Sequence, residues 1–271
     1  MTGATRVARA RKAARARLAP ALGLGAVGAL LLAGCAAPAE ADADEGALGG
    51  TLTVLAAASL TEVFDAAAVA FEAKHPGVDV IVSVGGSGAL AEQILAGAPA
   101  DVFAAANESA MARVVEAGLA DETPVFATNT LELVVPVGNP AEVHDLSDLG
   151  RSELAIALCD ETVPCGAATV ELLSLANVTA TPDTLESDVK AVLTKVLLGE
   201  ADAGLVYRTD VQAAGSAAEG IEVPEAAAVV NRYPIAALAE ASNSEAAAAF
   251  VAFVLSEAGQ ALLEEAGFGA S

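Results

Sequence analysis

The sequence predicts an α/β fold of two lobes. From Thr51 onwards, short runs of β-branched residues alternate with stretches of helical period, which is typical of α/β proteins. This part of the chain has about 220 residues, enough for one large domain or two smaller lobes. A late strand at 234–239 returns to the first set of elements after the second is complete. Two lobes joined by two chain crossings therefore fit the order better than one open sheet.

The first 35 residues have the pattern of a bacterial export signal. Six basic residues and no acidic one accompany an apolar run from Leu18 that ends at Leu32-Ala-Gly-Cys35. The run is shorter than the roughly 20 residues of a membrane-spanning helix. Its ending resembles a lipobox, which implies cleavage before Cys35 and lipidation of its thiol; a plain signal peptide with a chance cysteine is the alternative. We expect an exported protein, lipid-anchored on the outer face of the cytoplasmic membrane.

The chain beyond the signal is strongly acidic. Residues 36–50 are rich in alanine, glycine and acidic residues without a periodic apolar face, so they are predicted to be a flexible tether. All 36 acidic residues lie beyond Cys35, whereas six of the 13 basic residues precede it. This charge disfavours nucleic acid and anionic lipid as partners. Because salt screens exposed charges beyond about 8 to 10 Å, local donors can still bind a small anion.

Residues 51–127 and 234–271 form the predicted lobe 1. A strand is expected at 51–57, and Ser59-Leu-Thr-Glu62 matches a capping box that opens a helix to about Lys74. A second strand runs from Val80 into glycines 85, 86 and 88, which permit a tight turn before a helix with Leu90, Ile94 and Leu95 on one face. The other expected elements are a short strand to Ala106, a helix at 111–117, the returning strand, and helices at 246–255 and 258–266.

Residues 128–233 form the predicted lobe 2. Strands are expected at 131–137, 154–158 and 203–207, and helices at 167–175 and 188–198. Since strands that alternate with helices usually run parallel, each lobe is predicted to be a mixed, mostly parallel sheet flanked by helices.

The glycine turn at 85–89 is the strongest candidate site from the residues alone. The helix that follows it presents free backbone N–H groups and a partial positive charge, which suit an anion. The turn also loosely matches the dinucleotide fingerprint, with Glu108 as the acidic residue, and the nucleophile elbow around Ser87. An exported protein has no supply of nucleotide, however, and a Ser87 nucleophile would need His144 from the other lobe as its base. No enzyme activity, catalytic residue or cofactor is expected.

Five segments resemble the periplasmic molybdate-binding proteins of ABC importers. They follow the family's order and are Ala56–Thr61, Gly85–Ile94, Gly97–Phe103, Val163–Gly166 and Gly204–Tyr207. The resemblance covers essentially all of residues 51–268. It implies a monomer with the type II periplasmic-binding-protein fold, which captures molybdate or tungstate and delivers it to an ABC permease and its ATPase.

The resemblance also implies which residues hold the oxyanion. Lobe 1 would contribute the hydroxyl and amide of Ser59 and of Ser87. Lobe 2 would contribute the backbone N–H groups of Cys165 and Val189 and the hydroxyl of Tyr207. All but Tyr207 lie at or beside predicted helix N-termini, where each dipole is worth roughly 0.3 to 2 kcal/mol. Neutral donors would then hold the anion, and the metal is expected only as the oxyanion.

These assignments have structural alternatives. Ser59 could merely cap its helix by accepting from the Glu62 N–H, and Tyr207 could be an ordinary aromatic at a strand end. Asp101 fits a turn or hinge better than a ligand, because a carboxylate repels a dianion.

Cys159 and Cys165 are the only cysteines beyond Cys35. In an exported protein a disulfide between them is expected; two buried thiols or a soft-metal site are the alternatives.

Two other functions compete with molybdate capture. One is a receptor for another tetrahedral oxyanion, such as sulfate or phosphate. Sulfate is smaller, and phosphate carries a proton that needs an acceptor, which the five residues do not supply. The other is a surface interaction lipoprotein that uses the fold without a small ligand.

Overall fold

The computed structural model describes residues 48–271. The predicted export signal, the lipidation site at Cys35 and nearly all of the predicted tether lie outside these residues. Among the described residues no single helix is long and apolar enough to cross a membrane, and one pair bent by 60°, 244–255 with 257–265, passes that test only when taken together.

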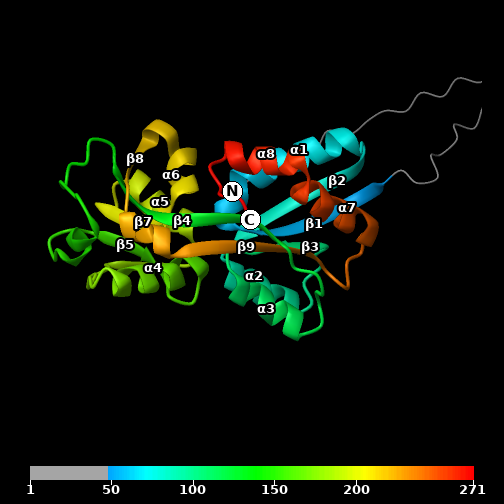
Figure 1. Ribbon diagram of the computed structural model, residues 1–271, viewed down its shortest axis with the longest axis horizontal. Helices are drawn as coiled ribbons and strands as arrows, with labels where there is room; N and C mark the ends of the chain where they lie inside the picture. Colours follow the sequence, from blue (N-terminus) through cyan, green and yellow to red (C-terminus); the bar gives the residue numbers. More distant parts are fainter. Residues whose placement is uncertain (1–47) are drawn as a thin grey trace, which may run out of the picture. The chain divides into compact units, whose positions relative to one another are not determined.

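Nine strands form one mixed sheet (Figure 1), in the order β2-β1-β3-β9-β4-β7-β5-β6, with β8 paired to β4 off this path. Their bounds are β1 Gly49–Ala57, β2 Gly77–Gly85, β3 Val102–Ala104, β4 Val125–Pro136, β5 Ile156–Cys159, β6 Thr184–Glu186, β7 Ala203–Tyr207, β8 Ala218–Ile221 and β9 Val230–Ala237. β1 begins two residues before the predicted boundary at Thr51, and β6 and β8 were not predicted. The last two residues of the predicted tether therefore belong to the sheet.

The long strands β4 and β9 join the two lobes. They pair antiparallel from Val125↔Pro234 to Thr130↔Val230, and each continues into a different lobe. In Figure 1 they run side by side between the two groups of helices. Because the chain crosses in one direction and returns in the other, β4 is antiparallel to β7, β8 and β9, and β3 is antiparallel to β9. The predicted mixed sheet with flanking helices is confirmed, although only four of the eight strand pairs are parallel.

Helices cover both faces of the sheet in lobe 1. Leu52 and Val54 on β1 pack in one apolar cluster with α1 (Thr61–Lys74), α7 (Ser244–Leu255) and α8 (Glu257–Glu265). Leu55, on the opposite face of the strand, packs in another cluster with α2 (Ser87–Leu95) and α3 (Glu108–Glu116). Leu90 and Ile94 of α2 are buried as predicted, but Leu95 is 38 % exposed because it lies beyond the buried stripe.

Lobe 2 has its own apolar core. One cluster of buried side chains runs from Leu131 to Val229 and joins β4, β5 and β7 to the helices α4 (Pro164–Leu175) and α5 (Val189–Leu197). A short helix that was not predicted, α6 (Arg208–Ala214), follows β7 directly. Separate cores on either side of β4 and β9 allow each lobe to move as a unit.

Candidate functional site

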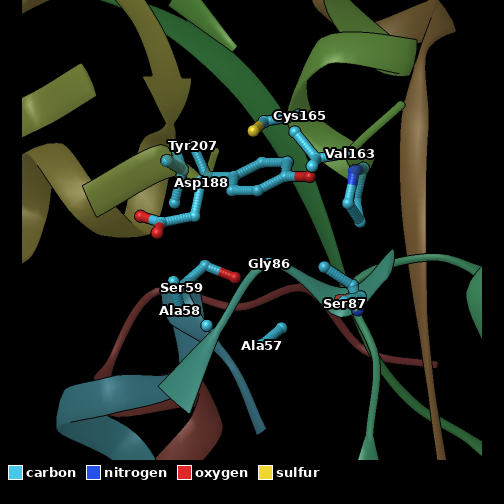
Figure 2. Close-up of a pocket in the computed structure, with 13 residues that line it drawn as sticks. Ala57, Ala58, Ser59, Gly86, Ser87, Val163, Cys165, Asp188 and Tyr207 are labelled. Carbon is cyan, nitrogen blue, oxygen red and sulfur yellow. Dashed lines mark hydrogen bonds between the residues drawn. The ribbon is translucent and has the colours of Figure 1, made fainter. Parts of the chain in front are cut away.

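A pocket lies between the two lobes (Figure 2). Its walls are formed where the chain leaves the carboxyl ends of strands, the usual position of ligand sites in α/β sheets. Lobe 1 contributes residues 57–59, 85–87 and 106, and lobe 2 contributes residues 163–165, 188, 189 and 207. All five residues that the resemblance implied line this one pocket: Ser59, Ser87, Cys165, Val189 and Tyr207.

The helices α2, α4 and α5 begin at the pocket. α2 starts after Gly86 and α4 after Val163, and neither cap residue makes a side-chain hydrogen bond to the first turn. α5 starts after Asp188, whose Oδ1 accepts from the Ala191 N–H at 2.9 Å. The first-turn N–H groups of a helix have no intrahelical acceptor, and the dipole adds partial positive charge. The converging starts of α2, α4 and α5 thus favour an anion.

Ser59 does not cap α1. It lies in a short 3-10 turn, Ala58–Leu60, that precedes the helix, and Leu60 rather than Ser59 is the cap residue. The extra turn carries the hydroxyl away from the Glu62 N–H, and Oγ lies 3.0 Å from the Tyr233 hydroxyl oxygen instead. The capping-box prediction is therefore wrong, and this buried hydroxyl faces the pocket region.

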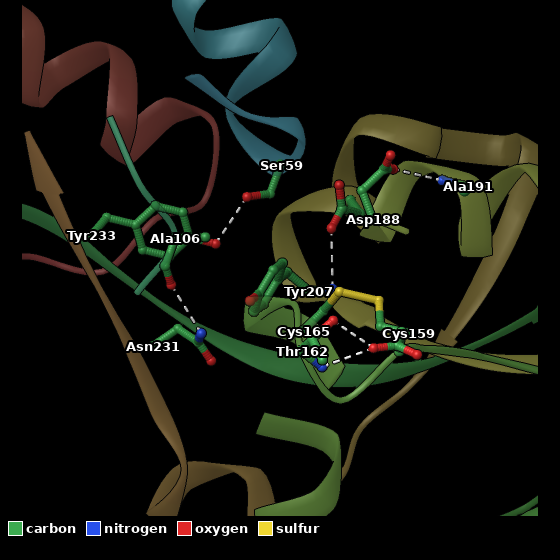
Figure 3. Close-up of a disulfide and its surroundings, with 12 residues drawn as sticks. Ser59, Ala106, Cys159, Thr162, Cys165, Asp188, Ala191, Tyr207, Asn231 and Tyr233 are labelled. Atoms are coloured by element: carbon green, nitrogen blue, oxygen red, sulfur yellow. Dashed lines mark hydrogen bonds between the residues drawn. A yellow bond between two sulfur atoms is a disulfide. The ribbon is translucent and has the colours of Figure 1, made fainter. Parts of the chain in front are cut away.

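Ser87 is the first residue of α2 and is only 1 % exposed. Its Oγ accepts a hydrogen bond from the Ala106 N–H at 3.0 Å, and the Ala106 carbonyl accepts from Asn231 at 3.0 Å (Figure 3). Since a hydroxyl can accept and donate at the same time, Ser87 keeps its proton for a ligand oxygen.

Tyr207 ends β7, and its ring lies along the lobe 2 wall of the pocket (Figure 2). The side chain is 1 % exposed, and its hydroxyl has no hydrogen-bond partner among residues 48–271. Burial, with Tyr233 and Asp210 nearby, holds the Tyr207 pKa well above its ordinary value, so the phenol stays protonated. A buried hydroxyl without a partner costs roughly 1 to 3 kcal/mol, which an acceptor on a ligand would offset.

A disulfide joins Cys159, the last residue of β5, to Cys165 in the first turn of α4, with the Cα atoms 5.8 Å apart (Figure 3). Asp160 Oδ1 accepts from the N–H and hydroxyl of Thr162 in the loop between them. The loop is wound so tightly that a Cβ on Gly166 would overlap the Asp160 carbonyl oxygen. Both devices fix the direction of the Cys165 N–H.

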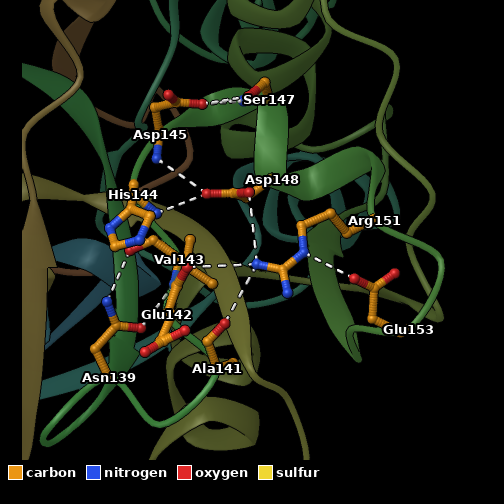
Figure 4. Close-up of polar contacts among 10 residues, drawn as sticks. All are labelled: Asn139, Ala141, Glu142, Val143, His144, Asp145, Ser147, Asp148, Arg151 and Glu153. Carbon is orange, nitrogen blue, oxygen red and sulfur yellow. Dashed lines mark hydrogen bonds and ion pairs between the residues drawn. The ribbon is translucent and has the colours of Figure 1, made fainter.

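Among the described residues, the pocket wall carries no cationic side chain, neither lysine nor arginine. Ser87 Oγ accepts from a backbone amide. His144 lies in the exposed β4–β5 loop of lobe 2, where its backbone N–H donates to Asp148 Oδ2 at 2.7 Å (Figure 4). A hydrolytic role for Ser87 has no support in this geometry, whereas reversible binding of an anion does.

Asp101 is a buried structural residue of lobe 1. Its carboxylate accepts from the Thr53 N–H at 2.7 Å, the Ser242 hydroxyl at 3.0 Å and the Asn243 N–H at 2.9 Å. These bonds tie β1 to the start of α7. Asp101 does not line the pocket.

Sequence reasoning missed the polar residues behind the pocket. Asn129 on β4 and Asn231 on β9 face each other in the crossing strands. The Asn129 amide donates to Thr209 Oγ1 at 2.8 Å, and its nitrogen also lies 3.5 Å from the Tyr233 hydroxyl oxygen. Asparagine is depleted in strands, so two asparagines at the expected crossings are the signal that could have identified these residues.

Known proteins are similar to this chain in sequence. The family described as bacterial extracellular solute-binding protein matches residues 52–269. The molybdate-binding protein ModA of Mycobacterium tuberculosis (strain H37Rv) is 40% identical over 253 residues, covering 91% of this chain and 97% of ModA.

Two solved structures share the architecture. A substrate-binding domain attributed to a molybdenum ABC transporter of Clostridium difficile is 30% identical, with a TM-score of 0.62 over 82% of this chain and 99% of that one. The periplasmic molybdate-binding protein of Azotobacter vinelandii has a TM-score of 0.71 over 81% of this chain and 99% of that one, and at 19% identity it shows the shared fold alone.

Proposed function

The chain belongs to the family of bacterial extracellular solute-binding proteins, and from that premise we propose that it captures molybdate, and equally tungstate, between its lobes for delivery to an ABC importer. Its fold is the type II periplasmic-binding-protein fold. Its relatives are binding proteins rather than enzymes, so the oxyanion is a ligand and not a cofactor.

The observation that carries the proposal is the convergence of neutral donors from both lobes. Ser59 and Ser87 reach the pocket from lobe 1, and Cys165, Val189 and Tyr207 reach it from lobe 2. The Tyr207 hydroxyl is buried and without a partner among the described residues, and Ser87 retains a donor proton. These groups suit the four oxygens of a tetrahedral dianion.

The same donors favour a fully deprotonated oxyanion over phosphate. Phosphate near neutral pH carries a proton and needs an acceptor. Among residues 48–271, Asp188 is the one carboxylate that lines the pocket; its Oδ1 accepts from the Ala191 N–H, so only its Oδ2 could accept a phosphate proton, and the phosphate titration tests this point. Sulfate has no proton but is smaller than molybdate, so donors on opposite walls would be stretched.

Titration calorimetry of the tag-free chain beginning at Ala36 with molybdate, tungstate, sulfate and phosphate tests the proposal. We expect binding of the first two only, weakened by Ser59→Ala and Ser87→Ala. Ser152→Ala, on an exposed turn of lobe 2, is the matched control. The chain has two tyrosines and no tryptophan, and both tyrosines lie at or behind the pocket, so intrinsic fluorescence reports the site directly. Sulfate or phosphate binding in place of molybdate would refute the ligand assignment.

We further propose that the mature protein is a monomer, anchored by lipid on Cys35 outside the cytoplasmic membrane, and that a permease with its ATPase supplies the energy of transport. The support for the anchor is the lipobox at Leu32–Cys35. Cys35→Ala is expected to move the protein from the membrane fraction to the soluble fraction on cell fractionation. Retention of the variant in the membrane fraction would contradict the anchor.

A further inference from the structure

Lys190 bridges the two lobes beside the pocket. It is the second residue of α5 in lobe 2, directly after Val189, and its Nζ lies 2.8 Å from both carboxylate oxygens of Glu62 on α1 in lobe 1. The same Nζ lies 3.1 Å from Oδ1 of Asp210 on α6 in lobe 2. One ammonium therefore contacts a carboxylate in each lobe.

The two carboxylates differ in burial, which gives them different tasks. Asp210 is fully buried, and its second oxygen, Oδ2, accepts from the Tyr207 N–H at 3.1 Å. Glu62 has a side chain that is 55 % exposed, so it loses little hydration in the contact and can separate from Lys190 easily. Asp210 thus holds the ammonium in lobe 2, and Glu62 is the partner that changes when the lobes part.

We propose that Lys190 is a positioning residue that holds the lobes closed over the bound ligand, anchored by Asp210 and bonded across the cleft to Glu62. The proposal rests on the proposed function, because it concerns the closed, ligand-holding state of the same pocket. Lys190 does not line that pocket. It acts through its neighbours: Val189 follows Asp188 at the start of α5, and Asp210 is bonded to the backbone of Tyr207.

The alternative is that Glu62 only adds negative charge near an anion. The two ideas predict opposite changes in the affinity for the anion when Glu62 is neutralised. Removal of a nearby negative charge would tighten anion binding, whereas loss of a bond between the lobes would weaken it. Asp65 lies one turn along the same helix, is exposed like Glu62, and provides the matched control for charge alone.

Stopped-flow tyrosine fluorescence with molybdate on Glu62→Gln, Asp65→Asn and the parent chain tests the proposal. We expect Glu62→Gln to raise the dissociation rate about two- to five-fold with the association rate unchanged, as for loss of a partly exposed ion pair. Asp65→Asn should leave the dissociation rate unchanged or lower it. Equal behaviour of the two variants would overturn the proposal.

A double-mutant cycle excludes a purely structural role. Lys190→Gln should weaken binding, Lys190→Arg should restore it, and adding Glu62→Gln to Lys190→Gln should cause no further loss. Strictly additive effects would overturn the proposal, even if Lys190→Gln lowers the melting temperature. If the parent chain does not bind molybdate, the proposed function fails instead, so the two failures are distinguishable.

Discussion

Gly86→Ala should hold the lobes apart without disturbing either of them. Gly86 is the cap residue of α2, with φ −63° and ψ 129°, a conformation open to any L-residue. A methyl group there would lie 2.5 Å from the carbonyl oxygen of Ser187 and 3.5 Å from Cγ1 of Val163, both in lobe 2. The added atom therefore meets the opposite lobe and not its own.

The size of the effect follows from that overlap. Ordinary contact begins near 3.4 Å, so the Ser187 backbone must retreat by about 0.9 Å from α2. Forcing an extra methyl into a packed interface costs typically 1 to 3 kcal/mol. Because only the closed form is affected, we expect the dissociation constant for molybdate to rise about 5- to 150-fold.

Calorimetry measures the affinity for molybdate, and thermal unfolding without ligand measures the stability of the ligand-free protein. The melting temperature of ligand-free Gly86→Ala should equal that of the parent chain. Ser152→Ala, on an exposed turn of lobe 2 that does not line the pocket, is the control. A folded Gly86→Ala protein that binds molybdate with the parent affinity would show that this close approach is not part of the bound state.

Three further variants test the site and its surroundings. Tyr207→Phe removes a buried hydroxyl that has no partner among the described residues, so calorimetry should show the affinity for molybdate falling about tenfold or more. The stability of the ligand-free protein should not fall. A loss of stability with unchanged affinity would contradict the assignment. Burial raises the pKa of Asp210 to about 6 from 3.8, so its protonation stabilises the fold at low pH. This stability, on the order of a few kcal/mol in all, is lost as pH rises through 6, and part of it should be regained when pH falls from 7.5 to 5. Urea unfolding of Asp210→Asn should lack that increment, and an unchanged slope would refute it. Replacing Cys159 and Cys165 by serine should lower the free energy of unfolding by about 2 kcal/mol, because the closed loop is short. It should also weaken molybdate binding in calorimetry, because the start of α4 is no longer fixed. Unaltered affinity would mean that the disulfide does not position the Cys165 N–H.

The elements that could be predicted from the sequence are those fixed by local chemistry. The strand at 203–207 has the predicted bounds, and α2 follows directly after the glycine turn. The missed elements lack such signals. β6 is three residues, Thr-Leu-Glu, with an exposed leucine, and α6 has only seven residues and begins without a break after β7.

The five predicted residues line one pocket, but their contacts could not be predicted from the sequence. Ser59 matched a capping box, yet its hydroxyl meets Tyr233, which lies 174 positions away. Lys190 and Glu62 are 128 positions apart, and the sequence pattern of each helix predicts only a solvated surface charge at that position. Such pairs depend on how β4 and β9 bring the lobes together, and a local pattern does not encode that.

The arrangement of charge explains how so acidic a chain can hold an anion and release it. Three carboxylates lie at or near the proposed site: Asp188 accepts from an amide of α5, and Asp210 and Glu62 both pair with Lys190. The nearby cation therefore neutralises protein carboxylates and leaves the ligand to neutral donors. Hydrogen bonds to a charged donor are roughly twice as strong as neutral ones, so a cage of N–H and O–H groups binds an oxyanion less tenaciously. Retention then depends on closure, through Gly86 against Ser187 and Lys190 against Glu62, and a partner that separates the lobes removes these contacts and the donors of one wall together.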